Sequence, residues 1–516
     1  MNKNNICSLK FSILLLLMTG SLISSAMPQD TVLTVTYKGK LDSLNSSILK
    51  QKRFIQVFIP QGYKAGSSDK YDVLYVLDGG NWNTGLINQI QHFMEAQDRM
   101  PATIIVSVLG IDRNIELTPT HLDSWNAPTG GAGDFLSFIK NELIPYINIT
   151  YPSNGENTLW GHSLGGMFVI YALINEPTTF KSYIAVDPSV WWDNCYVPKM
   201  AAKKWTASTS LNTTLFIGAR EGLSVHDLRI DTMKIVLEKT APLGLNWKLL
   251  IYPDETHSSV RLKTTYDGLK SIYAGYTTRI EFNPMNGIVL KDKPFKIWYD
   301  ADTARVYYTL DGTTPTELSA KVQSEITVPG AARITYKLFT GRSTYDKIIS
   351  GNFTAEKVSP PVSKPGNSKS GGFNYAYYEG DWDKMPDLSS LKPVKTGIAN
   401  KNFDAADLPR KNNYTLVLDG FLEAKEEGYY VFYLLAGKGT KLSIGGNLIV
   451  QSAENSIQPY YSFLMPLSKG FYPVRVEYFS KKEDFNLQLG YITPGKMITK
   501  DPIPIPLEVQ YGTGNK

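Results

Sequence analysis

The chain has 516 residues, of which 42% are hydrophobic and 20% are charged. This composition is typical of a folded globular protein and argues against a largely disordered one, and the length predicts two to four domains. The net charge of +5 is small for such a length and no long run of lysine and arginine is present, so nucleic acid is not an expected partner.

The N-terminus has the three parts of an export signal. Lys3 and Lys10 flank the start, an apolar run follows at residues 11–18, and Ser-Ser-Ala at residues 24–26 offers a cleavage site. We expect residues 1–26 to be a signal peptide and the mature protein to be periplasmic or extracellular, with no transmembrane segment. A retained membrane anchor is the alternative, which the shortness of the apolar run disfavours.

Residues 27–278 alternate short apolar runs with longer stretches of helical periodicity. The runs at 71–79, 103–111, 214–220 and 247–255 are predicted strands that end in polar or turn residues. This alternation predicts a mostly parallel sheet with helices on both faces, whose carboxyl ends collect ligands and catalytic residues.

After residue 280 the helical periodicity disappears and short alternating strands follow. A stretch rich in Pro, Ser, Lys and Gly at 357–372 is a predicted linker, because such a composition cannot bury a core. The sequence therefore predicts two all-β domains, at 280–356 and at 373–511.

A G-x-S-x-G motif, Gly161-His162-Ser163-Leu164-Gly165, follows a strand-like run at 157–160 and precedes a helical run that ends at a proline. A strand, a tight turn and a helix are the setting in which such a serine is held exposed as a nucleophile, and the glycines relieve collisions there. A glycine-rich turn with an ordinary surface serine is the alternative.

A nucleophilic serine needs a general base later in the chain, and an acid that orients this base. Of the five histidines, His226 and His257 follow the serine; His257 is favoured because it lies in YPDETHSSV, directly after a predicted strand. For the acid we favour Glu221, immediately after the strand at 214–220. Asp227, or a Ser-His dyad without a dedicated acid, remains open.

The oxyanion of an acyl-transfer intermediate needs two backbone N–H donors. Leu164, the residue after the nucleophile, is the expected first donor. The loop LDGGNW at 77–82 is the expected source of the second, through Gly79 or Gly80, of which Gly79 is favoured; a simple turn is the alternative.

Several ordered segments resemble the esterase family of α/β-hydrolases that includes periplasmic siderophore esterases and, more distantly, feruloyl and acetyl-xylan esterases. They are YDVLYVLDG, RNIELTP, GGAGDFLSFIKNELIPYI, GHSLGG, DPSVWW and YPDETHSSV. The resemblance implies an α/β-hydrolase fold and ester hydrolysis without a cofactor or metal. It also makes Arg113 and Trp191 substrate-binding candidates. Asp187 stands where a serine is expected.

The segment VYYTLDGTTPTELSA resembles the C-terminal β-sandwich module of chitobiases and hexosaminidases, and residues 373–511 resemble a PA14 domain. These resemblances imply accessory domains that could bind polysaccharide. Adhesin-type PA14 domains hold calcium with paired aspartates; Ala436-Gly437-Lys438 stands there instead, so calcium is not expected.

The leading hypothesis is a serine esterase that acts through an acyl-enzyme on ester-linked acyl groups of polysaccharides. A trilactone-type siderophore esterase is the alternative within the same chemistry. A carbohydrate-binding surface protein with a non-catalytic hydrolase domain, and an enzyme that transfers the acyl group to a sugar, are further alternatives.

Overall fold

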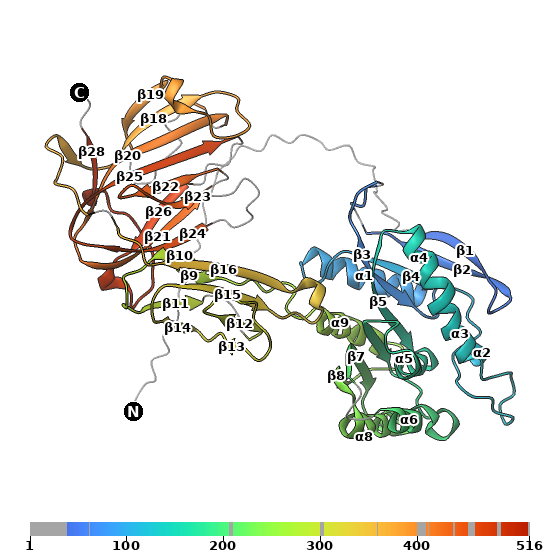
Figure 1. The fold of residues 1–516 in the computed structure, drawn as a ribbon. Coiled ribbons are helices and arrows are strands. Elements are labelled where there is room, and N and C mark those ends of the chain that lie inside the picture. The colour runs from blue at the N-terminus through green and yellow to red at the C-terminus, as the bar shows by residue number, and fades with distance from the viewer. Residues whose placement is uncertain are drawn as a thin grey trace, which may run out of the picture.

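The computed structural model (Figure 1) describes residues 39–60, 62–64, 66–205, 210–299, 304–358, 360–399, 409–410, 412–436, 439–451, 460–481 and 487–513. The expected signal peptide lies outside these residues, as do Gly437 and Lys438 of the segment that bears on calcium.

A mostly parallel sheet of eight strands forms the centre of the α/β part, in the order β1-β2-β4-β3-β5-β6-β7-β8. The first two strands are antiparallel and lie at one edge, and the other six run parallel to one another. The strands are β1 (Lys40–Ser46), β2 (Gln51–Phe58), β3 (Tyr71–Val76), β4 (Thr103–Val108), β5 (Ser153–His162), β6 (Ser182–Val186), β7 (Ser210–Arg220) and β8 (Leu243–Tyr252). The predicted α/β class is confirmed.

Side chains of β3 alternate between two apolar layers. Val73 and Tyr75 pack into the larger cluster, whereas Leu74 and Val76 pack into a second cluster on the opposite face. Because successive side chains of a strand point to opposite faces, a continuously apolar strand must be covered on both sides.

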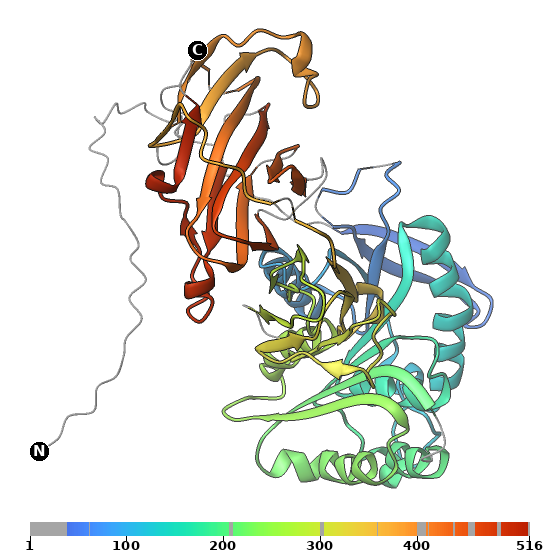
Figure 2. The same cartoon turned by 60° about the vertical axis from the view of Figure 1, so that its left-hand side comes forward.

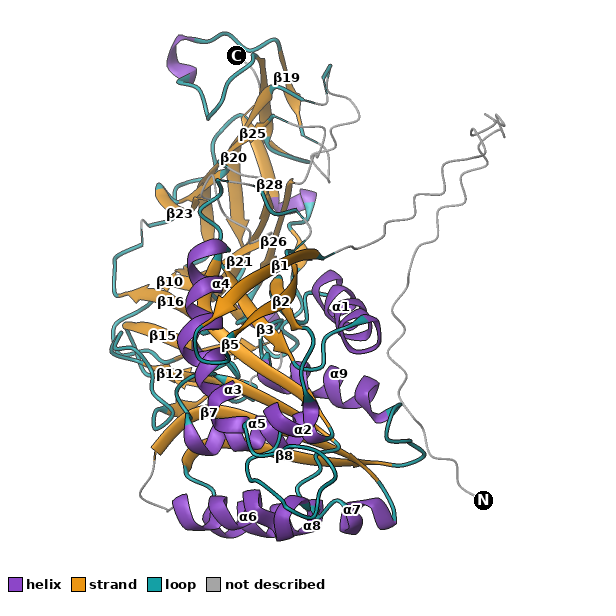
Figure 3. Ribbon diagram, turned by 90° about the vertical axis from the view of Figure 1, so that its right-hand side faces the viewer, coloured by secondary structure: helices purple, strands orange, loops and turns teal. Residues whose placement is uncertain are grey.

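Helices cover both faces of this sheet, as predicted. Figure 3 shows α1 and α9 on one side and α3 and α4 on the other. The helices are α1 (Asn81–Ala96), α2 (Arg113–Glu116), α3 (Ala132–Phe138), α4 (Ile144–Thr150), α5 (Leu164–Asn175), α6 (Trp192–Lys204), α7 (Leu223–Asp227), α8 (Ile230–Thr240) and α9 (Val260–Ile272), with a π-helical turn at Ile139–Leu143. None of the helices in the described part of the chain is long and apolar enough to cross a membrane.

The region after residue 280 is built from strands, and its described residues contain no α-helix. The upstream strands are β9 (Phe282–Asn283), β10 (Asn286–Ile288), β11 (Phe295–Tyr299), β12 (Val306–Thr309), β13 (Ala320–Lys321), β14 (Glu325–Val328), β15 (Ala332–Leu338) and β16 (Lys347–Thr354). The downstream strands are β17 (Ser368–Ser370), β18 (Asn374–Glu379), β19 (Lys395–Ile398), β20 (Tyr414–Ala424), β21 (Gly428–Ala436), β22 (Lys441–Ile444), β23 (Asn447–Gln451), β24 (Tyr460–Leu467), β25 (Gly470–Ser480), β26 (Leu487–Ile492), β27 (Ile503–Pro504) and β28 (Gln510–Thr513).

One nine-stranded sheet passes through both β regions, in the order β13-β12-β15-β16-β10-β24-β21-β26-β27. The join is β10, which pairs in parallel with β16 on one side and with β24 on the other. Figure 2 shows the upstream strands, in yellow, between the α/β part and the orange and red C-terminal strands. The two β regions, drawn as separate domains from the sequence, therefore share a sheet; their boundaries stay predictions.

Arg342, in the turn between β15 and β16, anchors the β region to the α/β part. Its guanidinium forms an ion pair with Asp72 of β3 and donates a 2.7 Å bond to Oγ1 of Thr158 in β5, and all of these groups are buried. The hydroxyl of Tyr345 donates to the same aspartate at 2.8 Å. This contact lies near the amino-terminal ends of the parallel strands, the edge opposite Ser163.

Candidate active site

Ser163 occupies a strained turn between β5 and α5. Its φ of 62° and ψ of −116° lie outside the regions that ordinary residues favour. A Cβ on Gly161 would lie 2.3 Å from the carbonyl oxygen of Gly165, and one on Gly166 would lie 2.9 Å from the carbonyl oxygen of Val186. Only glycine fits at these two places without backbone movement. Gly161 is the first glycine of the motif, whereas Gly166 lies one residue beyond it.

The hydroxyl of Ser163 lies beside a second serine that the sequence analysis did not select. Ser163 Oγ is 3.1 Å from Ser189 Oγ, and the amide of Ser189 donates to the carbonyl of Ser163 at 3.0 Å. Ser189 follows β6 and is almost fully buried. The turn after β6 therefore packs directly against the nucleophile's turn.

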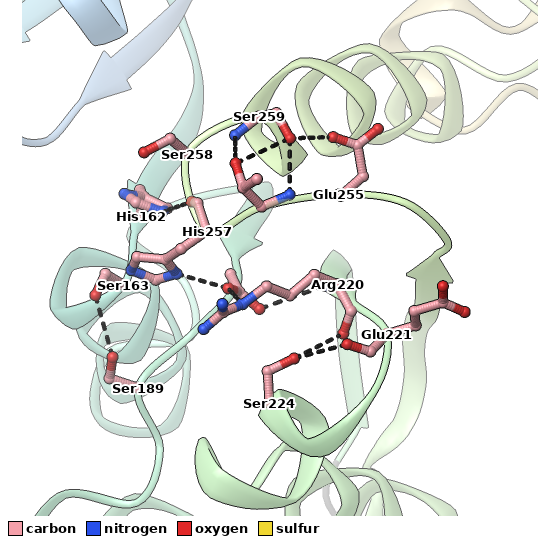
Figure 4. A network of polar contacts seen from close by, with 12 residues as sticks. His162, Ser163, Ser189, Arg220, Glu221, Ser224, Glu255, His257, Ser258 and Ser259 are labelled. Atoms are coloured by element: carbon pink, nitrogen blue, oxygen red, sulfur yellow. Dashed lines mark hydrogen bonds and ion pairs between the residues drawn. The ribbon is translucent and has the colours of Figure 1, made fainter.

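His257 lies in the loop between β8 and α9, and Figure 4 shows its imidazole beside Ser163. Its Nδ1 is 2.6 Å from Oδ2 of Asp187, a fully buried residue directly after β6. A carboxylate on Nδ1 fixes the ring so that the other nitrogen, Nε2, is free to accept a proton. The structure thus brings Ser163 and His257 together and places the carboxylate of Asp187 against His257.

The choice of Glu221 as the acid is contradicted by the contacts of its side chain. Glu221 is exposed, its Oε1 accepts a 3.3 Å bond from the amide of Asp254, and in Figure 4 its carboxylate points away from His257. Successive residues at a strand end point in opposite directions. Arg220 takes the inward direction, so Glu221 is turned outward.

The other candidates for the acid and the base, Asp227 and His226, also lie outside this group of contacts. Asp227 is exposed on α7, and His226 is exposed and contacts Asp231 through Nδ1 at 2.9 Å. The missed acid did carry a signal, because an aspartate stands in DPSVWW where the related pattern has a serine. Choosing this aspartate over Glu221 required knowledge of how β6 pairs with its neighbouring strands.

Of the two backbone amides expected to bind the oxyanion, one is available and the other is already hydrogen-bonded. Leu164 is the first residue of α5, so its amide has no acceptor inside the helix. The amide of Gly79 donates to the carbonyl of Val108 at 2.9 Å, which contradicts its assignment as the second donor. The glycine at this position serves packing, because a Cβ there would lie 2.1 Å from Ser107 Oγ.

Arg113 lies at the site with a carboxylate partner. It begins α2 and forms an ion pair with Asp78, which follows β3 and is largely buried. A Cβ on Gly165 would lie 3.3 Å from Oδ2 of Asp78, which places this carboxylate against the first turn of α5. Burial raises the pKa of Asp78, and the charge of Arg113 opposes that shift. Substrate binding by Arg113 stays a prediction.

Trp191 belongs to a cluster of three tryptophans. Its ring centroid is 5.8 Å from that of Trp192 and 6.3 Å from that of Trp125, and Trp125 is itself 39% exposed. The indole nitrogen of Trp125 is 3.4 Å from Oδ1 of Asn114. The cluster therefore lies near Arg113, and Trp191 is two residues from Ser189 along the chain. Trp191 accordingly stays a substrate-binding candidate.

His162 is held neutral beside the general base. Its Nε2 is 2.7 Å from the carbonyl oxygen of His257, and the two imidazole rings are 4.4 Å apart. Burial, and then the charge of His257, lower the pKa of His162 to about 3. His162 therefore donates a hydrogen bond that fixes the His257 loop and does not itself exchange protons near neutral pH.

Two family models match the chain. Residues 46–230 match the family described as "Putative esterase", and residues 369–502 match the family described as PA14 domain. Ser163 and Asp187 lie inside the first match, and His257 lies beyond its end. The chitobiase-like module at 280–356 stays a prediction.

Curated relatives match parts of the α/β region. The chain is 43% identical over 68 residues to a siderophore enterobactin esterase of Emericella nidulans, which covers 13% of this chain and 22% of that protein. It is 31% identical over 138 residues to a ferri-bacillibactin esterase of Bacillus subtilis, which covers 25% of this chain and 48% of that protein. The matched stretches thus span less than half of these relatives' own length.

Solved structures are similar as well. An IroE-like serine hydrolase from Shewanella oneidensis is 31% identical, with a TM-score of 0.41, over 46% of this chain and 80% of that chain. The siderophore hydrolase EstA from Aspergillus nidulans is 20% identical, with a TM-score of 0.41, over 48% of this chain and 97% of that chain. The comparisons thus agree on an esterase-like region that includes residues 46–230 and on a PA14-like region at residues 369–502.

Proposed function

We propose that this protein is a serine carboxylic ester hydrolase in which Ser163, His257 and Asp187 form the catalytic triad. The observation that carries the proposal is the 2.6 Å contact between His257 Nδ1 and Asp187 Oδ2 beside a serine on a strained turn. This arrangement activates a serine hydroxyl whatever the fold or the order of the residues.

In the first half-reaction, Ser163 Oγ attacks the ester carbonyl carbon while its proton passes to Nε2 of His257. The resulting imidazolium is stabilised by Asp187, and the amide of Leu164 donates to the oxyanion. His257 then gives the proton to the leaving alkoxide oxygen as the ester C–O bond breaks, which leaves an acyl-Ser163 ester and the free alcohol.

In the second half-reaction, water takes the place of the alcohol. His257 Nε2 accepts a proton from the water, whose oxygen attacks the acyl carbon, and the proton then returns to Ser163 Oγ as the carboxylic acid leaves. The chain's own side chains perform every one of these proton transfers.

For the substrate, we propose esters of the siderophore class. Support comes from the curated relatives, which include siderophore esterases from fungi and bacteria. The exposed tryptophan of the cluster and the neighbouring Arg113 suit a substrate that carries aromatic rings and negative charge. The expected export signal fits a protein that works outside the cytoplasm.

Ester-linked acyl groups of polysaccharides are the second candidate substrate, favoured by one observation: a PA14 domain follows the hydrolase domain in the same chain. Such a domain could hold the enzyme on a glycan. Retention of the full chain on an insoluble polysaccharide, with and without an excess of the same polysaccharide in soluble form, measures this.

The test of the chemistry is hydrolysis of p-nitrophenyl acetate by the mature protein, beside Ser163→Ala and His257→Ala variants of matched folding. We expect both variants to lose at least ~10³-fold in kcat/KM. Enterobactin and acetylated xylan, offered next, separate the two substrate classes. An inactive wild type, or variants that keep its rate, would instead favour a carbohydrate-binding protein with a non-catalytic hydrolase domain.

A further inference from the structure

A second cation shares the carboxylate oxygen that holds the general base. Oδ2 of Asp187 accepts from His257 Nδ1 at 2.6 Å and from Arg220 Nε at 2.8 Å. The backbone amide of Arg220 also points to the other oxygen, Oδ1, at 3.4 Å. Figure 4 shows the guanidinium of Arg220 beneath the ring of His257. One residue therefore contacts both oxygens of the aspartate.

Sheet geometry places Arg220 on the correct face for this contact. β6 and β7 are parallel neighbours, and Gly218 lies opposite Val186, the residue before Asp187. Gly218 and Arg220 are two residues apart and share a face. A Cβ on Gly218 would meet Thr264 of α9, so this face is the one that α9 covers, and the loop that carries His257 leads directly into α9.

Burial makes such a partner necessary. Asp187 has no exposed surface, and a buried carboxylate is stable only when paired and hydrogen-bonded. Its φ of 41° is a left-handed conformation that is uncommon outside glycine. His257 by itself is an incomplete counter-charge, because it must alternate between neutral and protonated forms in each catalytic cycle. Arg220 stays charged throughout that cycle.

We propose that Arg220 is a positioning residue of the esterase: it locks the Asp187 carboxylate in register with His257 and, through its fixed positive charge, favours the neutral, proton-accepting form of that histidine. This inference rests on the proposed function. Arg220 does not touch the reacting atoms in this scheme and acts only through Asp187.

Other charged groups lie around His162, whose ring is 4.4 Å from that of His257. His162 is neutral near pH 7 because burial lowers its pKa to about 3. Arg113 and Arg261 lie close enough to act electrostatically on His162, and Asp187 contacts His257 through Nδ1. Among the cations, Arg220 is the one bonded to the carboxylate itself, so its removal isolates this effect.

The test compares Arg220→Met, which removes the charge and the donors, with Arg220→Lys, which keeps a charge on a more flexible stem. Arg475→Met is the matched control, since Arg475 pairs with Asp419 and Glu477 on the surface of the C-terminal region. Hydrolysis of p-nitrophenyl acetate is followed from pH 5 to 9, together with the rate at which a fluorophosphonate probe labels Ser163.

For Arg220→Met we expect kcat to fall by about 10- to 100-fold with KM within about twofold, the signature of an interaction needed in the transition state. We also expect the midpoint of the acidic limb of kcat/KM to move up by about half to one pH unit, because loss of a nearby positive charge lets His257 keep its proton to higher pH. Arg220→Lys should keep the wild-type midpoint with a kcat between those of wild type and Arg220→Met.

The proposal is overturned if Arg220→Met keeps the wild-type kcat and pH midpoint, or if Arg220→Lys shifts the midpoint as far as Met does. Should Arg220→Met fail to fold, the Lys variant decides alone: a wild-type kcat in it contradicts the positioning role. Ser163→Ala separates the two levels of the argument. If it keeps the wild-type rate, the esterase proposal itself fails; if it is inactive while the Arg220 variants match wild type, only the role of Arg220 fails.

Discussion

Nδ1 of His257 lies 2.6 Å from Oδ2 of Asp187, although the two residues are 70 positions apart and follow different strands of the sheet. The carboxylate that contacts His257 therefore follows β6, whereas the sequence analysis placed the acid after β7. Both strand ends reach the same edge of a parallel sheet, so either can present a carboxylate to the histidine. Which one does so depends on the direction in which each side chain points.

Asp187→Asn should abolish most of the activity. The amide keeps the shape of the carboxylate but cannot stabilise the imidazolium and favours the wrong tautomer of the histidine, which we expect to lower kcat by ~10³- to 10⁴-fold. Turnover of p-nitrophenyl acetate, corrected for the folded fraction, measures the loss.

Glu221→Gln is the control for that change, and we expect its kcat to stay within about twofold of wild type. The reason is that Glu221 is exposed and its carboxylate accepts a hydrogen bond from the amide of Asp254, away from His257. A large loss of kcat in Glu221→Gln, together with a mild effect in Asp187→Asn, would instead support Glu221, the residue after β7, as the acid.

Gly161→Ala should destabilise the hydrolase domain. The added Cβ would lie 2.3 Å from the carbonyl oxygen of Gly165, and that oxygen belongs to helix backbone that cannot turn aside. We expect a loss of about 2–3 kcal/mol in the free energy of unfolding, measured by urea denaturation. Gly85→Ala is the matched control: it lies inside α1 with open space around its Cβ, and should stabilise by about 0.5–1 kcal/mol.

Arg342→Met should weaken the α/β part from a distance. The change leaves Asp72 buried and without its counter-ion, which costs about 3–5 kcal/mol. Tryptophan fluorescence reports mainly this part of the chain, which holds seven of the nine tryptophans. Arg333→Met, an exposed arginine of the same β region, should change stability by less than about 0.5 kcal/mol. An unaltered transition in Arg342→Met would mean that the β region does not support the sheet.

Acid should destabilise the protein through His162. The pKa of this histidine is about 3 in the folded protein against 6.5 for an unperturbed side chain, so below pH 6.5 the unfolded chain binds a proton that the folded one does not. The free energy of unfolding therefore falls as the pH drops from 6.5 towards 3, by at most about 1.4 kcal/mol per pH unit from this group.

His162→Gln keeps a donor near the carbonyl of His257 without the titration. Between pH 7 and pH 5 we expect the wild type to lose about 2 kcal/mol more than this variant in urea denaturation. Equal losses in the two proteins would show that His162 accepts a proton in the folded state as readily as in the unfolded one.

Local patterns in the sequence were sufficient to select Ser163 as the candidate nucleophile and to predict the class of fold. Gly161 avoids a collision with Gly165, only four residues away, so this part of the motif has a local structural reason. The histidine followed from the small number of candidates and from its place after a predicted strand. Continuous apolar runs, such as residues 71–79, predicted strands that are covered on both faces. The reason is that a strand buried on both sides needs apolar residues at successive positions.

Contacts between strands decided the rest. The amide of Gly79 pairs with the neighbouring strand, so it cannot serve as the second oxyanion donor. Strand pairing likewise joined two predicted domains into one sheet through β10.

The sequence by itself thus determined that this is an α/β protein with Ser163 and His257 at the end of its sheet, followed by β-rich regions. Only the tertiary structure decided that Asp187 contacts His257, that Arg220 shares its carboxylate, and that Arg342 connects the β region to β3. The physical reason is one of range. Periodicity and turn chemistry act between neighbours along the chain, whereas a hydrogen bond between strand ends depends on strand order and side-chain direction, which are fixed only when the sheet assembles.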